Sequence, residues 1–119
     1  MAGWNLALRF ALEIAALVGA AAGAWSLTGG VWRWIAAAVA ALAAVTAWGV
    51  FNVVGDPSRS GRAPVEVSGV QRLTIEAMVL GLGIVGLVIV VPWLGVIVAC
   101  ATVVHYGFSR TRLAWLLRF

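Results

Sequence analysis

The stretch Val70–Val91 reads VQRLTIEAMVLGLGIVGLVIVV and contains no charged residue after Glu76. A helix needs about 20 apolar residues to cross the hydrocarbon core of a membrane, so this stretch predicts a transmembrane helix. Three further apolar runs predict three more, of which the last is the shortest. The expected fold is an all-α membrane protein, a single four-transmembrane-helix bundle over residues 1–119. The expected spans are 4–27, 31–54, 70–91 and 93–109, with a loop at 55–68 and a tail at 110–119.

The composition of the chain excludes a soluble globular domain. Of the 119 residues, 64% are hydrophobic and 10% are charged, whereas soluble domains carry about 25% charged residues. All of the basic residues are arginines, and they give a net charge of +4. Because these arginines lie at helix ends and in loops, we interpret the charge as a membrane-orientation signal and expect no nucleic-acid partner.

The positions of the arginines predict the orientation in the membrane. Arg59 and Arg62 lie in the central loop and three more arginines lie in the tail, whereas Arg33 occupies the turn on the opposite side. Loops rich in arginine stay in the cytoplasm, so we expect both termini in the cytoplasm. The first apolar run lacks a basic region before it and is longer than a signal-peptide core, so we interpret it as a retained helix.

The pattern Arg-x-x-x-Glu occurs twice, as Arg9–Glu13 in the first expected helix and Arg72–Glu76 in the third. Both helices run in the same direction, so the two helical hairpins form a parallel two-plus-two repeat. A spacing of four places Arg and Glu on one helix face. The charges then pair either within each helix or across the repeat, as Arg9 with Glu76 and Arg72 with Glu13.

These charged residues predict an intramembrane polar cluster in the cytoplasmic half of the bundle. An ionised carboxylate inside the membrane is costly unless it is paired, and such residues normally face the bundle interior. The cluster is either a conduction or coupling site, or a device that holds helix register while the arginines reach toward the headgroups. Its expected members are Arg9, Glu13, Asn52, Arg72, Glu76, His105 and Tyr106.

Glycines in the first and third expected helices predict close helix packing. Small residues let transmembrane helices approach each other, within one chain or between chains. The pattern Gly-x-Gly-x-x-Gly in the third helix also matches a dinucleotide-binding motif, but that motif requires a strand before it. The expected packing residues are Gly19, Gly23, Gly81, Gly83 and Gly86.

The tail mixes arginines with tryptophan and leucine, which is typical of a short amphipathic helix on an anionic membrane surface. We expect Arg110, Arg112 and Arg118 to contact the lipid headgroups of the inner leaflet.

Six segments of the chain resemble the YrdB family of small bacterial membrane proteins. In its tail this chain has Arg110 and Thr111 where members of the family often carry Tyr-Asp. The resemblance implies a four-span protein of a bacterial inner membrane, of unknown function. The matching segments are 5–13, 48–51, 55–65, 72–76, 105–106 and 115–117.

Two functions are compatible with these features. The first is a structural or interaction protein that associates with itself or with a larger membrane complex, as the small-residue faces and the tail indicate. The alternative is a homo-oligomeric channel or transporter that uses the Arg/Glu quartet to handle protons or ions. An enzyme is not expected, because no catalytic spacing is present. With one cysteine, Cys100, and one histidine, we expect neither a metal site nor a cofactor.

Overall fold

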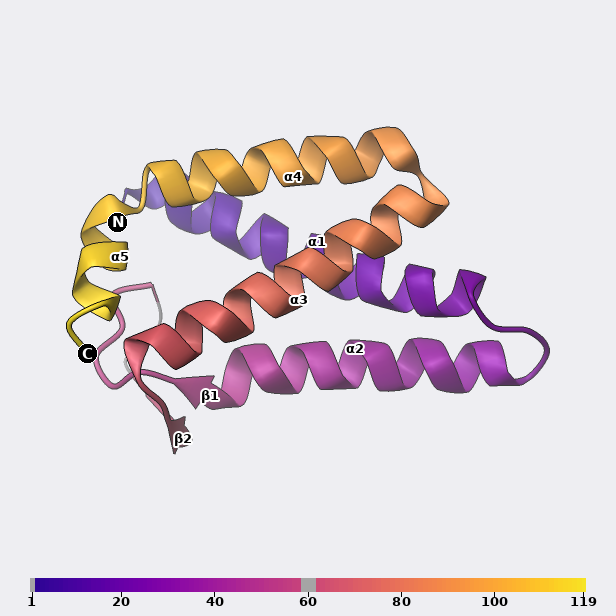
Figure 1. The fold of residues 1–119 in the computed structure, drawn as a ribbon, viewed down its shortest axis with the longest axis horizontal. Helices are drawn as coiled ribbons and strands as arrows, with labels where there is room; N and C mark the ends of the chain where they lie inside the picture. The colour runs from indigo at the N-terminus through magenta and orange to yellow at the C-terminus, as the bar shows by residue number, and fades with distance from the viewer. Residues whose placement is uncertain (1, 59–61) are drawn as a thin grey trace.

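The computed structural model describes residues 2–58 and 62–119, and helices dominate it. The chain is therefore all-α in class, as expected, although two short strands join the helices. In Figure 1, α1 and α3 run in the same direction and α2 and α4 return, so both termini lie at one end of the bundle with α5 and the strands. The elements are α1 (Gly3–Ser26), α2 (Trp32–Val50), β1 (Phe51–Asn52), β2 (Val65–Glu66), α3 (Gly69–Val90), α4 (Pro92–Gly107) and α5 (Arg110–Leu116).

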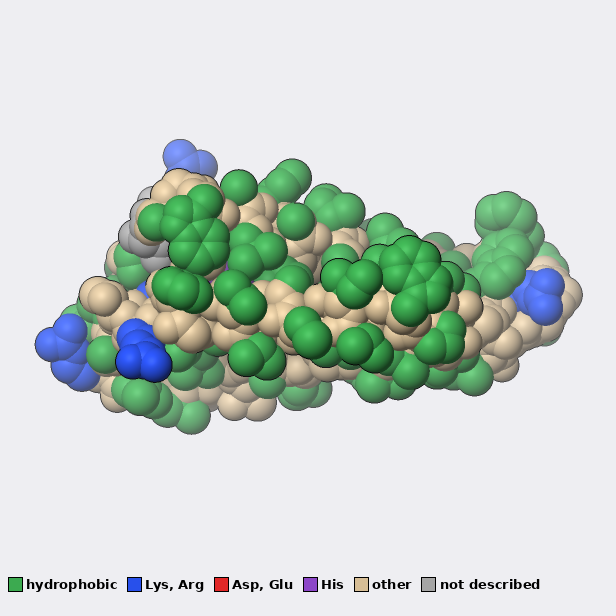
Figure 2. Space-filling model, turned by 90° about the horizontal axis from the view of Figure 1, so that it is seen from above, with side chains coloured by type: hydrophobic (Ala, Val, Ile, Leu, Met, Phe, Trp, Pro, Cys, Tyr) green, Lys and Arg blue, Asp and Glu red, His purple; other side chains and the backbone are tan. Residues whose placement is uncertain are grey.

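By length and composition, α1, α2 and α3 are each able to cross a membrane. The fourth, α4, passes the same test only together with α5, from which it is bent by 73°. With 16 residues, α4 is about 24 Å long, somewhat less than the hydrocarbon core of about 30 Å. Figure 2 shows hydrophobic side chains along the length of the molecule and arginines at its two ends, a distribution consistent with a membrane protein.

The second helix is shorter than the sequence predicts. It ends at Val50 instead of residue 54, because Phe51 turns to an extended conformation and begins strand β1. Strand β1 pairs in parallel with β2, so that Phe51 faces Val65 and Asn52 faces Glu66. The loop expected at 55–68 therefore contains a strand, and its residues 59–61, which include Arg59, lie outside the described residues.

Two polar side chains account for the early end of α2. The last carbonyls of a helix have no partner within the helix. Here Arg72 Nη1 donates to the carbonyls of Trp48 at 2.7 Å and Phe51 at 2.9 Å, and Asn52 Nδ2 donates to the carbonyl of Gly49 at 2.7 Å. A side chain on α3 thus helps to terminate α2.

The closest packing is between α1 and α3, where glycines of the two helices face each other. A Cβ atom added to Gly19 would lie 2.0 Å from the carbonyl oxygen of Gly83, and one added to Gly23 would lie 2.7 Å from Cα of Gly86. These four glycines therefore pack within the chain. Gly81 does not, because a Cβ atom there would have no neighbour within 4 Å. Gly81 lies on a different face of α3 from Gly83, so packing within the chain was wrong at this position, and packing between chains stays a prediction.

The buried apolar core follows the same helix pair. It includes Leu12 and Ala16 of α1 and Leu80 and Leu87 of α3, with Trp48 of α2 at one side. This core ends at the level of Trp48, and toward the termini the buried side chains become polar.

Candidate functional site

Glu76 of α3 lies at the centre of a buried group of charges, and 1% of it is exposed. Arg9 binds both of its carboxylate oxygens, at 3.2 and 3.0 Å. Arg112 does the same, at 3.1 and 2.6 Å, and Arg72 Nε adds a contact of 2.8 Å. Tyr106 donates its hydroxyl to the same carboxylate. A carboxylate offers about four lone-pair positions, so the contacts to Glu76 saturate it.

Arg112 joins this group to the loop that follows α2. Its Nε and Nη2 atoms donate to the two oxygens of Asp56, at 2.9 and 2.7 Å. Arg112 is 1% exposed, so the prediction that it contacts lipid headgroups was wrong, whereas Arg110 and Arg118 are exposed. Below, the charged cluster means the five residues that these contacts connect: Arg9, Asp56, Arg72, Glu76 and Arg112.

The position of α5 explains why Arg112 is buried. The bend of 73° turns α5 away from the direction of α4. It packs against the start of α3 so closely that a Cβ atom on Gly69 would lie 1.5 Å from the carbonyl oxygen of Leu116. Leu116 and Arg112 both point inward as a result. Figure 1 shows α5 at the end of the bundle that also holds the N-terminus.

Asp56 is held in place by its own turn as well as by Arg112. The backbone N–H and the hydroxyl of Ser58 both donate to its Oδ1 atom at 2.9 Å, an arrangement typical of Asp before a turn. Burial raises the pKa of Asp56, but the hydrogen bonds and charge of Arg112 and the bonds from Ser58 outweigh it, so the pKa lies below its usual value. Asp56 is therefore ionised at neutral pH and balances part of the charge on Arg112.

His105 of α4 is fully buried beside the charged cluster. Its Nε2 atom lies 3.3 Å from Arg9 Nη1 and its Nδ1 atom lies 2.7 Å from Asn5 Oδ1. A guanidinium group has only donors, so Nε2 accepts, and Nδ1 carries the proton and donates to Asn5. This arrangement assigns a neutral imidazole. Asn5 in turn donates to Ser109 Oγ at 2.9 Å, which connects α1 to the segment between α4 and α5.

Trp48 packs against two arginines of the cluster. The guanidinium carbons of Arg9 and Arg72 lie 4.8 and 4.9 Å from the centre of its rings. A cation over the face of a tryptophan ring and within about 6 Å of its centre forms a cation–π interaction, which is stronger when water is excluded. Trp48 therefore forms the boundary between the apolar core and the charged cluster.

The two Arg-x-x-x-Glu repeats have different environments. Arg9 pairs with Glu76 across the repeat, while Arg72 also pairs with Glu76 within α3. Glu13 is half-buried and lines a separate cavity of about 180 Å³ with Phe10 and Trp48. The difference arises because the C-terminal half of the chain brings Tyr106 and Arg112 to Glu76.

Four polar residues of this site were not predicted from the sequence. Asn5, Asp56 and Ser109 were not expected at any site, and Arg112 was expected at the lipid headgroups. Arg9, Arg72, Glu76, His105 and Tyr106 lie together, and Asn52 is buried at the nearby end of α2. Asp56 could have been singled out because acidic residues are rare in this chain, which has four in all. Among the described residues, no group of three or more histidine, cysteine, aspartate or glutamate side chains is arranged to hold a metal ion.

The substitution Arg112→Gln tests whether α5 depends on the charged cluster. We expect a loss of about 2 kcal/mol in stability, because Asp56 loses its cationic partner inside the protein while Glu76 keeps two arginines. Thermal unfolding in detergent measures the effect. Arg110→Gln and Arg118→Gln remove exposed charges from the same segment and serve as matched controls that should melt like the wild type. Equal melting of all three variants would show that α5 does not need this contact.

Comparison with known proteins shows a family and a similar protein, both of unknown function. Residues 7–104 match a family described as "Protein of unknown function (DUF2568)". The chain is also 37% identical over 114 residues to "Uncharacterized protein YrdB" of Bacillus subtilis (strain 168), which covers 95% of this chain and 93% of that protein. No solved structure matches the chain.

Proposed function

This chain belongs to the DUF2568 family, which includes proteins like YrdB, and from that premise we propose that it is a structural and interaction protein of the bacterial cytoplasmic membrane. It spans the membrane four times with both termini in the cytoplasm, and it assembles with a second copy or within a larger membrane complex. Its charged cluster holds the cytoplasmic end of the bundle together.

The observation that carries this proposal is the saturation of Glu76 by three arginines and Tyr106. A carboxylate that conducts protons or ions has to exchange its partners during each cycle. Here such an exchange would separate bidentate arginine pairs in a buried site, and breaking a buried pair costs about 3–5 kcal/mol. The cluster is therefore better suited to holding α1, α3, α4 and α5 in one arrangement than to transport.

The helix that best suits assembly is α2, the least buried of the three long helices. In an apolar 18-residue stretch of α2, 11% is buried within the chain, against 28% for the corresponding stretch of α1 and 33% for that of α3. Ala38, Leu42 and Val45 are exposed, and their spacing places them on one face. Alanine on such a face lets another helix approach closely.

This function predicts that the protein forms oligomers through α2 and leaves vesicles impermeable to protons. We expect Leu42→Cys, made in a Cys100→Ser background, to form disulfide-linked dimers in native membranes. Val103→Cys on α4, which is exposed to a similar degree, is the matched control and should stay monomeric. Proteoliposomes of the wild type should hold a pH gradient as long as empty liposomes do.

Two results would contradict this function. A proton or potassium flux in wild-type proteoliposomes that is lost in Glu13→Gln, with the variant folded, would favour the channel or transporter. Equal cross-linking at Leu42 and Val103 would indicate random collision in the membrane instead of assembly through α2.

A further inference from the structure

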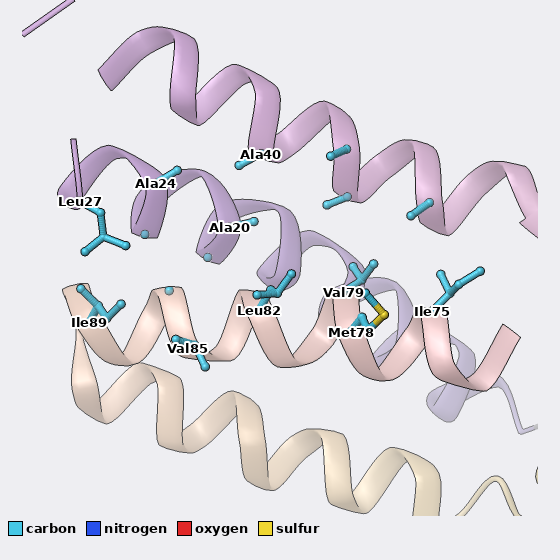
Figure 3. Close-up of a pocket in the computed structure, with 16 residues that line it drawn as sticks. Ala20, Ala24, Leu27, Ala40, Ile75, Met78, Val79, Leu82, Val85 and Ile89 are labelled. Carbon is cyan, nitrogen blue, oxygen red and sulfur yellow. The ribbon is translucent and has the colours of Figure 1, made fainter. Parts of the chain in front are cut away.

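A groove of about 480 Å³ runs between α2 and α3, from Ile75, next to Glu76, to Ile89 near the far end of α3. Figure 3 shows its lining side chains, with Leu27 and Ile89 at one end and Ile75 at the other. All residues that line it are apolar. From Ile75 to Ile89 it extends about 21 Å along α3, at a rise of about 1.5 Å per residue.

The walls of the groove differ in size. On α2 the wall is formed by alanines, such as Ala40 and Ala43, and on α1 mainly by glycines and alanines. On α3 it is formed by larger side chains, among them Met78 and Leu82. The small residues of α1 and α2 therefore leave space beside α3 that other parts of the described chain do not fill.

A positive charge is held at the end of the groove where α1 turns into α2. Arg33 Nε donates to the carbonyl of Thr28 at 3.0 Å, and Thr28 follows Leu27, which lines the groove. The guanidinium of Arg33 also lies 5.8 Å from the ring centre of Trp25. These contacts hold the guanidinium of an exposed arginine in the turn that follows Leu27, at one end of the groove.

We propose that this groove binds an anionic phospholipid of the surrounding membrane, with one acyl chain along α2 and α3 and the phosphate at Arg33. A helix has a diameter of about 10 Å with its side chains and brings no phosphate to Arg33. An acyl chain is narrower and wholly apolar, and arginine pairs with phosphate oxygens. The proposal rests on the membrane location in the proposed function and does not depend on self-association.

Native mass spectrometry of the full chain in neutral detergent, titrated with phosphatidylglycerol or phosphatidylcholine, tests the lipid site. We expect the wild type to retain phosphatidylglycerol. Ala43→Trp fills the groove from an exposed position and should weaken retention of both lipids about tenfold or more. Arg33→Gln should lower retention of phosphatidylglycerol about fivefold, the effect of one arginine near an anionic headgroup. It should weaken retention of phosphatidylcholine less, because the choline group already balances the charge of that lipid's phosphate.

Matched controls separate this site from general lipid association. Ala11→Trp places the same side chain at an exposed position on α1 outside the groove, and Arg110→Gln removes an exposed arginine at the opposite end of the bundle. Both should retain lipid like the wild type. Equal retention by Ala43→Trp and the wild type would overturn the proposal, because it would show lipid bound only around the bundle.

A third result would identify a different occupant. If the wild type is a dimer without lipid and Ala43→Trp makes it monomeric, the groove is an interface between copies and the lipid proposal is wrong. The proposed function has separate tests, since cross-linking at Leu42 and proton retention do not depend on the groove. Loss of lipid binding alone would therefore leave the proposed function intact.

Discussion

Glu76→Gln is expected to remove the folded protein almost entirely. The amide has nearly the shape of the carboxylate, but it leaves Arg9, Arg72 and Arg112 without the anion that they share. Removing one partner of a buried ion pair costs about 3–5 kcal/mol. Arg9 and Arg72 lose their contacts with this carboxylate, while Arg112 keeps its ion pair with Asp56. We expect a loss of at least about 5 kcal/mol, which approaches the whole stability of a typical domain.

The yield of monodisperse protein and its melting temperature in detergent measure this loss. Glu66→Gln is the matched control, because Glu66 is exposed and should tolerate the same change. The double variant Glu76→Gln, Arg9→Gln should recover part of the stability, since it removes one of the uncompensated charges. A Glu76→Gln protein that melts like the wild type would show that the arginines do not need this carboxylate.

Gly83→Ala should separate α1 from α3, while Gly81→Ala two residues earlier should be harmless. A Cβ atom on Gly83 would lie 2.5 Å from Cα of Ala16 and 2.8 Å from its carbonyl oxygen, so backbone atoms of α1 have to move. Overpacking costs about 1–3 kcal/mol, and we expect the upper end, about 3 kcal/mol, because the clash is with backbone. At Gly81 the added methyl group meets no atom within 4 Å.

The comparison between the two glycine variants is internally controlled. Alanine is a better helix former than glycine by about 1 kcal/mol, so Gly81→Ala should be as stable as the wild type or slightly more stable. Both substitutions make the same chemical change in the same helix. Thermal unfolding of the pair in one detergent should therefore differ by about 3–4 kcal/mol. Equal stability would mean that α1 and α3 are less tightly packed than the glycine contacts indicate.

The repeat in the sequence anticipated part of the charged cluster. Arg9, Arg72 and Glu76 carry charges on apolar helices, where a lone charge is costly, so the amino-acid types alone predict that these charges are paired in the interior, but not with which partner. His105 and Tyr106 are polar side chains at the end of an apolar run, so they too were expected to face the interior. The burial of Asp56 and Arg112 could not be predicted in this way, because both lie in polar segments where a charge can equally well face water.

Predictions from local sequence patterns were also wrong where a contact with a distant part of the chain overrides the local preference. Residues 51–54 continue an apolar run, yet α2 ends at Val50 because Arg72, far along the chain, donates to its last carbonyls. The tail has the pattern of a surface helix, yet it packs on α3 through Leu116 and Gly69. Gly81 and Gly83 are both glycines of α3, but only Gly83 faces α1.

The sequence by itself determined the helical class of this protein and the apolar length of its helices. Three of them are long and apolar enough to cross a membrane, and inside hydrocarbon a helix satisfies its own backbone. The tertiary structure decided which charge meets which, where α2 ends, and that Arg112 is buried while Arg110 and Arg118 are not. Those outcomes depend on contacts between segments far apart in the chain, such as Arg112 with Asp56, and no local pattern encodes the angle at which α5 turns from α4.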